Sequence, residues 1–243
     1  MRILFIFLLF TGGLLLKAQK NVTTFGLQFK PILSSEIINT GPQFEQVGDI
    51  GFEIDPANGY SFGMVIRKGY TDQLSFETGI NFTKRNFDLT ITDDSTGFVG
   101  KSDFTYVIYE IPVMGLIYVQ LGRQTYLNTA FGVSLDFLPS DWDSFDTYFQ
   151  HYSARKSWIV PSLLANVGFE YRTVSSGALY LGFSYHRPFS EISTAAVRYL
   201  QPDEFGNQIE QERAFFDILG NYLTIDLRYF FHEDPERRKK RRK

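Results

Sequence analysis

Ser184, His186 and Glu191 lie close together in the sequence and combine the residue types of a hydrolase site. A serine becomes a nucleophile when a histidine removes its proton and a carboxylate orients that histidine. Ser184 and His186 fall on one face of an expected strand, but this spacing arises often by chance. The sequence also has no strained nucleophile turn. We therefore predict that the protein is not an enzyme, with a lipid hydrolase as an alternative.

A second group of chemically interesting residues is the acidic motif Asp141-Trp142-Asp143 with Asp146. Its carboxylates are spaced somewhat like those of a calcium loop, but it lacks the central glycine and the distal bidentate glutamate. The two other histidines, His151 and His232, fall in an expected loop and in the C-terminal tail. The sequence has no glycine-rich phosphate loop. No cofactor and no metal ion is expected.

Charged residues on the polar faces of the expected strands form a third group. They alternate with apolar side chains, so each points away from the apolar face. Charges in a dry protein core are very costly, whereas inside a narrow barrel they can pair with one another. We predict a lumenal charge network of Glu77, Glu110, Glu170, Asp226, Arg67 and Arg228.

The elements that must position these residues are strands. Between residues 22 and 231, apolar and polar side chains alternate with a period of two, which is typical of strands with one apolar and one polar face. Pro112 and Pro161 are expected at bulges or near strand ends. The runs are Phe25–Lys30, Tyr60–Arg67, Leu74–Thr83, Thr105–Val119, Tyr126–Phe137, Trp158–Tyr171, Leu179–His186 and Asn221–Phe231.

Strand length and composition indicate a membrane-spanning barrel. Most runs approach the ~9–11 residues that a tilted strand needs to cross a bilayer. Aromatic residues make up 17% of the chain and crowd the strand ends, as interfacial girdles do. We predict an all-β fold, an eight-stranded antiparallel up-and-down transmembrane β-barrel whose lumen is closed by side chains. A soluble lipocalin-like barrel is an alternative.

The N-terminal segment predicts export from the cytoplasm. Arg2, an apolar run from Ile3 to Leu16 and a small residue at Ala18 form the layout of a secretory signal peptide. That run is shorter than the ~20 residues of a spanning helix. The chain has no cysteine, which excludes disulfides and an N-terminal lipid anchor. The expected organisation is a signal peptide at 1–18, a barrel at 19–231 and a basic periplasmic tail at 232–243.

The connections between the runs alternate long and short, which predicts a topology. The long ones are Ser34–Asn58, Asp88–Asp103, Pro139–Ser157 and Ser190–Gly220, and they contain 18 carboxylates against five Lys and Arg. With both termini in the periplasm, these connections face the cell exterior. We expect solvated acidic loops; divalent cations that bridge them to lipopolysaccharide are an alternative.

Charge is divided between an acidic body and a basic tail. The chain holds 24 Lys and Arg and 27 Asp and Glu. Without Arg2, Lys17 and the tail's seven basic and three acidic residues, the predicted barrel has 15 basic and 24 acidic groups. Nucleic-acid binding is excluded for a tail in the periplasm. Two alternatives remain for the tail: it is disordered, or it docks to an acidic periplasmic partner or anionic lipid. The basic residues that would dock are Arg237, Arg238, Lys239, Lys240, Arg241, Arg242 and Lys243.

Three segments carry a resemblance to a known family. Tyr109–Val113 resembles the Tyr/Leu-Glu-Ile-Pro signature of the PorT-like outer-membrane β-barrel family of Bacteroidetes, and Ser75–Gly79 and Leu127–Gly132 resemble its third and fifth strands. Tyr229 and Phe231 are similar to the C-terminal signal read by the barrel-assembly machinery, although twelve residues follow. The resemblance implies outer-membrane localisation, and for a few members a part in secretion or gliding machinery.

The functional hypothesis is a structural or accessory role in the cell envelope. The partners that it implies are outer-membrane lipid, lipopolysaccharide and the barrel-assembly machinery. A subunit of a secretion or gliding machinery, docking through acidic loops or the basic tail, is one alternative. The lipid hydrolase is the other.

Overall fold

The computed structural model describes residues 22–33, 41–71, 73–145, 148–174, 176–202 and 204–232. The predicted signal peptide, Asp146 and all seven basic residues of the tail lie outside these ranges. In the described ranges, no helix is long and apolar enough to cross a membrane. The prediction of an all-β antiparallel fold is confirmed, and the described residues form fourteen strands, more than the eight predicted runs.

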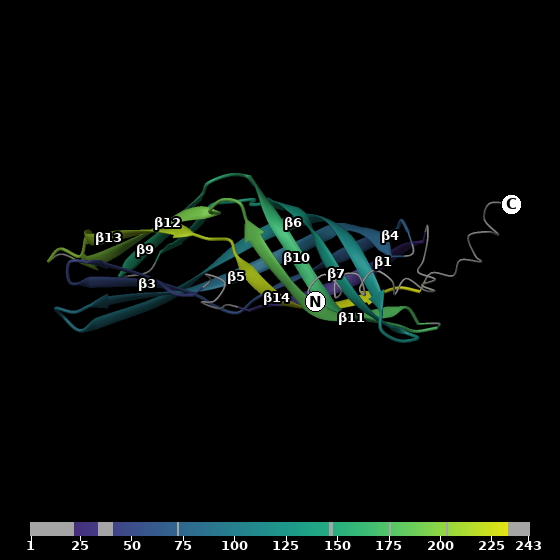
Figure 1. Cartoon of the computed structure of the whole chain (residues 1–243). Coiled ribbons are helices and arrows are strands. Elements are labelled where there is room, and N and C mark those ends of the chain that lie inside the picture. Colours follow the sequence, from purple (N-terminus) through teal and green to yellow (C-terminus); the bar gives the residue numbers. More distant parts are fainter. Residues whose placement is uncertain are drawn as a thin grey trace, which may run out of the picture.

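Neighbouring strands form a continuous cycle of antiparallel pairs, which we call the strand ring (Figure 1). Its order is β5–β4–β1–β14–β11–β10–β7–β6, and β6 pairs with β5 again. Strands that follow one another in the ring also follow one another in the chain, as in an up-and-down arrangement. The strands are β1 (Thr23–Leu33), β4 (Gly59–Gly69), β5 (Leu74–Asp93), β6 (Phe98–Gln120), β7 (Thr125–Phe137), β10 (Ile159–Arg172), β11 (Ala178–Pro188) and β14 (Tyr222–Phe230).

Short turns lie together at one end of the ring, which we call the proximal end. The turn after β6 is closed by backbone hydrogen bonds from Leu121 and Gly122 to Thr125, and the turn after β10 by one from Thr173 to Gly177. Gly177 adopts a φ of 93°, a conformation that glycine tolerates and other residues avoid. The start of β1 and the end of β14 are paired at this end too, through Gly26 and Phe230.

The expectation of solvated loops at the other, distal end is wrong. The first long connection contains β2 (Gln43–Val47) and β3 (Ile50–Pro56), the third contains β8 (Trp142–Phe145) and β9 (Phe149–Arg155), and the fourth contains β12 (Ser193–Pro202) and β13 (Gln208–Ile218). The second is the continuation of β5 and β6 as a long hairpin. These connections fold because they carry apolar residues that can share a core.

The distal strands form two packed sheets, which we call the distal sandwich. One sheet consists of β2, β3 and the distal parts of β5 and β6; the other has the order β13–β12–β9–β8. Gln43 Nε2 on β2 donates a hydrogen bond to the backbone oxygen of Asp217 on β13, 3.2 Å away, and so links two sheet edges. The buried core includes Phe52, Ile54, Leu89, Ile91, Tyr106, Leu138, Val197, Tyr199 and Phe216.

Strand β5 belongs to both the ring and the sandwich and changes polarity between them. In the ring, Phe76 and Ile80 point outward and are 46% and 45% exposed, whereas Asn81 points inward and is buried. In the sandwich, Leu89 and Ile91 point inward and are 1% and 0% exposed. Odd-numbered residues point inward along the whole of β5. These inward residues are polar in the ring and apolar in the sandwich, so the apolar side chains move from the outward to the inward face without a register shift.

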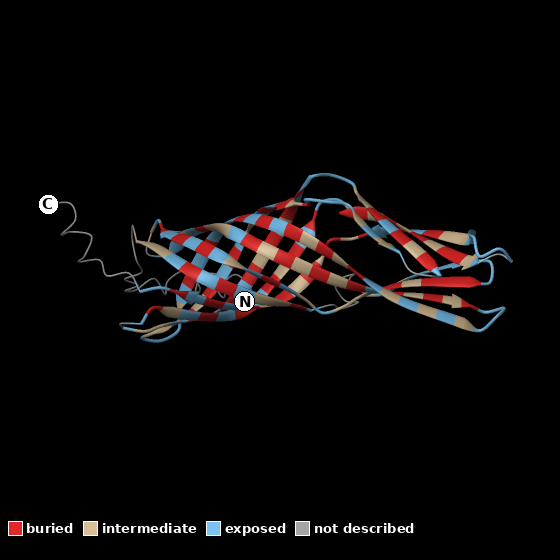
Figure 2. Cartoon of the chain, turned by 180° about the vertical axis from the view of Figure 1, so that it is seen from behind, coloured by how far each residue is buried: buried red, intermediate tan, exposed pale blue. Residues whose placement is uncertain are grey.

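The outward face of the ring is an apolar surface, along which exposed residues alternate with buried ones (Figure 2). Most of the exposed set is aliphatic or aromatic, with polar exceptions such as Lys68, Thr129 and Arg187. Soluble monomers rarely expose continuous apolar surfaces of this extent. The surface includes Phe25, Leu27, Phe29, Phe62, Met64, Phe76, Ile80, Val113, Ile117, Phe131, Val133, Val167, Phe169, Leu179, Leu181, Phe183 and Leu227.

The inward face of β6, β7 and β10 is also partly apolar, which explains why two of the predicted runs alternate less cleanly. Met114, Leu116 and Tyr118 pack with Tyr126, Ala130 and Leu164 in a buried cluster on this side of the lumen. Polar residues therefore occupy the remaining part of the lumen. The sequence of β6 is apolar on both faces because one face looks outward and the other meets this cluster.

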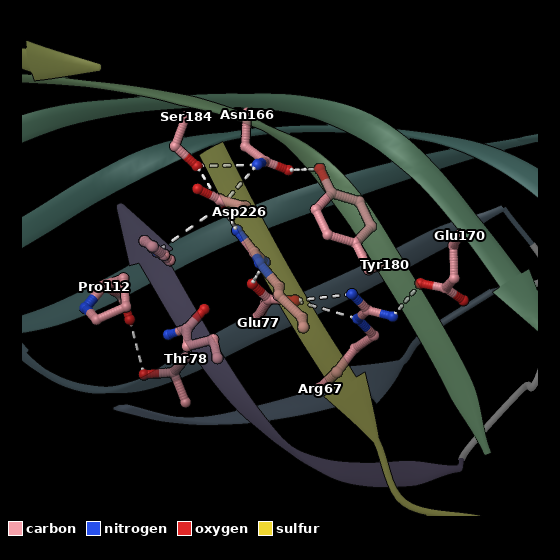
Figure 3. Close-up of polar contacts among 12 residues, drawn as sticks. Arg67, Glu77, Thr78, Pro112, Asn166, Glu170, Tyr180, Ser184 and Asp226 are labelled. Carbon is pink, nitrogen blue, oxygen red and sulfur yellow. Dashed lines mark hydrogen bonds and ion pairs between the residues drawn. The ribbon is translucent and has the colours of Figure 1, made fainter. Parts of the chain in front are cut away.

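Pro112 lies in the middle of β6 rather than at a bulge or a strand end. The β5–β6 ladder stops at Thr78–Val113 and resumes at Asn81–Glu110 in the same register. Proline has no N–H to donate to a ladder, which accounts for this gap. The Thr78 hydroxyl donates instead to the Pro112 carbonyl, 2.8 Å away (Figure 3). Pro161, in contrast, is the third residue of β10, near a strand end as expected.

Candidate functional site

The proximal half of the lumen contains a network of buried ion pairs centred on Arg67 of β4 (Figure 3). Its guanidinium lies 3.0 Å from Glu77 Oε2 on β5 and 2.5 Å from Glu170 Oε2 on β10. Glu170 also accepts from Arg172 Nε at 2.6 Å. The Arg67 guanidinium packs over the Phe230 ring, 3.7 Å from its centroid, a favourable cation–π contact.

Arg228 of β14 extends this network towards the middle of the lumen. Its two terminal nitrogens lie 2.5 Å from Glu77 Oε1 and 2.5 Å from Asp226 Oδ2. Asp226 in turn accepts hydrogen bonds from Ser184 at 2.6 Å and from Asn166 at 3.1 Å. Each carboxylate of this network thus has at least one cationic partner, as buried charges require.

Two glycines make room for one member of this network. Gly168 on β10 and Gly182 on β11 are paired directly, and a side chain at either position would collide with the Tyr180 hydroxyl. Tyr180 lies across both glycines and donates to Asn166 Oδ1 at 2.6 Å. The small residues on the polar faces of these strands therefore serve to pack a large side chain inside the lumen.

The ion pairs cross the lumen and fill it. In the order of the ring, β4 and β10 are opposite each other, so the Arg67–Glu170 pair joins opposite walls. At the proximal end a pocket of about 270 Å³ is lined by Arg67, Glu170, Arg172 and Phe230. A ring of this size encloses just enough space for its own side chains. Between this pocket and the middle of the lumen, the interior therefore contains paired charges.

Glu110, Asp136 and His186 form a separate group at the distal end of the lumen, which we call the distal lumenal cluster. All three are buried, and Glu110 and Asp136 are directly paired across β6 and β7. His186 Nε2 lies 2.9 Å from Asp136 Oδ2, and its ring stacks on Tyr222 with centroids 4.4 Å apart. Glu110 has no ion-pairing partner among the described residues, unlike the five other members of the predicted network.

The structure does not assemble the Ser184–His186–Glu191 group considered as a hydrolase site. Ser184 donates to Asp226, whereas His186 lies against Asp136. Glu191 is outside the ring and pairs with Lys156. Serine catalysis requires a hydrogen bond between the serine and the histidine, and these two side chains have different carboxylate partners.

The acidic motif at 141–143 has a structural role in the described part of the chain. Asp141 Oδ1 accepts a hydrogen bond from the backbone N–H of Arg155 at 3.0 Å, and Trp142 packs edge-on against Tyr106 with centroids 4.2 Å apart. Trp142 and Asp143 belong to β8, so they form a sheet edge and not an open loop. Asp146 lies outside the described residues.

Among the solved structures that resemble this chain is an outer membrane protein. The chain has a TM-score of 0.49 with the crystal structure of the outer membrane protein OprG from Pseudomonas aeruginosa, at 11% sequence identity, over 89% of this chain and 99% of that chain. No family model and no curated protein matches the chain. The functional argument below is therefore built on the geometry of this chain.

His151 was expected in a solvated loop but is fully buried in the distal sandwich. Its ring stacks on Phe104 with centroids 4.0 Å apart, and Nε2 lies 2.8 Å from the Ser153 hydroxyl. Burial disfavours the charged imidazolium and lowers the pKa of His151 from its ordinary 6.5 to about 4, against the opposing charge of Asp143. Only the alternation of apolar and polar residues around position 151 indicates this burial.

The pKa of His151 predicts a pH-dependent stability. Because the pKa is lower in the folded state, stability is fully present above pH 6.5 and is lost as the pH falls towards 4. The linkage relation gives a loss of about 2 kcal/mol at pH 5. We expect a lower urea midpoint at pH 5 than at pH 7.5, measured through the fluorescence of the two tryptophans, Trp142 and Trp158. His151→Gln should lose this part of the pH dependence, and an unchanged pH profile would contradict the prediction.

Several charged residues of the lumen lie outside the predicted charge network. Lys30 lies 3.9 Å from Asp226, and Arg172 and Asp136 contribute the pairs described above. Lys30, Asp136 and His186 all alternate with apolar neighbours, so the same polar-face rule identifies them. Arg172 ends its strand and was expected in a turn, where alternation gives no information.

Proposed function

We propose that this protein is an integral outer-membrane β-barrel of eight strands with a structural or accessory role in the cell envelope. One observation carries the proposal: the strand ring is apolar on its outward face and charged in its lumen, the reverse of a water-soluble barrel. Membrane lipid covers such a surface. The N-terminal segment, which has the layout of a secretory signal peptide, supports the outer membrane as the location.

The length of the strands supports this placement. Strand β6 has 23 residues, which corresponds to about 75 Å of extended chain. A tilted strand crosses the hydrocarbon core with ~9–11 residues. The proposal therefore places the proximal parts of β5 and β6 in the membrane and their distal parts beyond it. With the proximal end in the periplasm, the distal sandwich faces the cell exterior.

The closed lumen fits a role that does not involve transport through a wide pore. The Arg67–Glu170 and Arg228–Glu77 pairs occupy the part of the lumen where a large porin has its aqueous channel, which supports this role. Tyr229 and Phe231 are 38% and 47% exposed on the outward face at the end of β14. This position supports their proposed role as the signal for the barrel-assembly machinery.

Membrane fractionation and gel migration test the proposal. On expression in a Gram-negative host, we expect recovery in the outer-membrane fraction and faster gel migration before boiling than after it, because the folded barrel resists the detergent. Purified protein in planar bilayers should give no porin-like conductance steps. Recovery of folded protein in the soluble periplasmic fraction would contradict the membrane assignment, whereas large steady conductance would contradict only the closed lumen.

A second candidate function is a subunit of an envelope machinery that docks through the distal sandwich. The observation that favours it is a set of exposed aromatic residues on folded strands, Phe44, Phe145 and Phe215, with exposed fractions of 65%, 66% and 56%. Aromatic side chains are enriched where proteins associate. The PorT-like resemblance points the same way. Photo-cross-linking from position 145 in intact cells tests this candidate, with a probe at the ring position 183 as the control.

A further inference from the structure

The distal lumenal cluster presents three metal-ligating side chains from three different strands. Glu110 lies on β6, Asp136 on β7 and His186 on β11, and one ligand atom from each lies within 4.8 Å of the other two. Each residue is at most 4% exposed. The cluster is therefore enclosed by the protein and separate from the ion pairs at the proximal end.

The cluster is short of positive charge. In the proximal network, Arg67, Arg172, Arg228 and Lys30 face the carboxylates of Glu77, Glu170 and Asp226. In the distal cluster, two buried carboxylates face one imidazole. The nearby Arg85 donates instead to the backbone oxygens of Leu219 and Asn221. One imidazole can balance at most one of the two buried carboxylates, and a bound divalent cation would neutralise both.

The imidazole of His186 is ion-paired with Asp136 but makes no well-aligned hydrogen bond within the described part of the chain. Neither Nδ1 nor Nε2 has a hydrogen-bond partner of suitable geometry, although both are buried. Nε2 nevertheless lies 2.9 Å from Asp136 Oδ2, so it is directed into the cluster. A buried imidazole nitrogen without a hydrogen bond is unusual, and a metal ion is a natural partner for its lone pair.

Hydroxyl groups hold both carboxylates in place. Glu110 Oε1 accepts from the hydroxyls of Thr83, at 2.7 Å, and Tyr222. Asp136 accepts from Ser134, at 2.7 Å, and from Ser162. Partners of this kind surround protein metal sites, where they orient the ligands and raise their affinity for the ion.

We propose that Glu110, Asp136 and His186 bind one divalent transition-metal ion. One imidazole nitrogen and two carboxylates suit Zn²⁺ or Mn²⁺ better than Ca²⁺ or Mg²⁺, which favour oxygen ligands alone. Two ligands bound at ~2.1 Å are at most about 4.2 Å apart, a limit that the Asp136–His186 pair, 2.9 Å apart, already meets. The ion joins β6, β7 and β11 directly beneath the distal sandwich, and its role is structural.

Metal analysis of the purified protein tests the site. The full chain is folded into detergent with Zn²⁺ or Mn²⁺, unbound ion is removed by gel filtration, and bound metal is measured by mass spectrometry. We expect about one ion per chain and a higher melting temperature with the ion than without it. In Glu110→Gln and His186→Gln the affinity should fall by about tenfold or more. Mg²⁺ in place of Zn²⁺ should give no increase in melting temperature.

Matched variants distinguish this site from adventitious surface binding. Glu191→Gln and His232→Gln remove a carboxylate and an imidazole outside the lumen, and both should retain the ion. Absence of bound metal in the wild-type protein, or equal binding in Glu110→Gln and His186→Gln, would overturn the proposal. If these variants do not fold, pulsed electron paramagnetic resonance of the Mn²⁺-loaded wild type decides: nitrogen coupling from one imidazole is expected, and its absence overturns the site. All these measurements are made in detergent and do not depend on the proposed membrane function.

Discussion

Replacing Arg228 with methionine is expected to destabilise the folded protein by about 3–5 kcal/mol. Arg228 is 3% exposed and pairs with both Glu77 and Asp226. Methionine fills similar space but leaves Glu77 with one cationic partner and Asp226 with only Lys30, 3.9 Å away. Urea unfolding in detergent, followed by the change in gel migration, measures the loss.

An exposed ion pair provides the control for this variant. Arg213 pairs with Glu210 at 2.8 Å, but both side chains are more than a third exposed. Arg213→Met should therefore change the free energy of unfolding by less than about 1 kcal/mol. Adding Glu77→Gln to Arg228→Met should restore part of the stability, because it removes a buried negative charge that has lost one of its two cationic partners. A loss in Arg228→Met no larger than in Arg213→Met would show that the lumenal pairs do not hold the ring together.

Replacing Phe183 with arginine is expected to impair insertion and folding in lipid bilayers by about 2–4 kcal/mol. Phe183 lies near the middle of β11, points outward and is 51% exposed. If the ring spans a membrane, this position faces the hydrocarbon core, where a guanidinium loses its hydration. The yield of the fast-migrating folded form in lipid vesicles, compared with that of the wild type, measures the effect.

Phe215 provides a matched control because it has the same side chain and nearly the same exposure. It is 56% exposed, but it lies on β13 in the distal sandwich, beyond the proposed membrane boundary. Phe215→Arg should fold in vesicles as well as the wild type does. Equal yields for the two variants would mean that the outward face of the ring does not contact lipid, and the membrane proposal would fail.

Much of the strand ring follows from the alternation of apolar and polar residues. Each predicted run overlaps one ring strand, and the polar-face residues Glu77, Glu170 and Asp226 lie in the lumen. Pairing is harder to predict than position, because it depends on which strand lies opposite. Glu110 satisfies the same polar-face rule as Glu77, yet it faces Tyr222 from the opposite wall and not an arginine. Sequence periodicity contains no information about the order of strands across a lumen.

The distal sandwich was missed for a specific physical reason. The predicted third run ended at Thr83, because beyond it the apolar residues move to the face that had been polar. Phe87, Leu89 and Ile91 continue the inward positions of Glu77, Asn81 and Thr83. The acidic residues in the same connections are typical of solvated loops. In the structure, however, they lie on the solvent-facing side of strands. The alternation of apolar and polar residues continues beyond Thr83, but the apolar residues now occupy the positions that were polar before it. This exchange is the feature of the sequence that indicates the distal sandwich.

The continuity of β5 and β6 has a mechanical consequence. A hinge between two domains requires a segment whose backbone dihedrals can change, and this hairpin stays paired from Leu74–Ile117 to Asp93–Phe98 with a gap only around Pro112. From Phe87 to Asp93 it rises about 20 Å above the ring. A molecule bound to the tip of the sandwich is thus held at a fixed height and angle, and a lateral pull on the tip acts as torque on the wall of the ring.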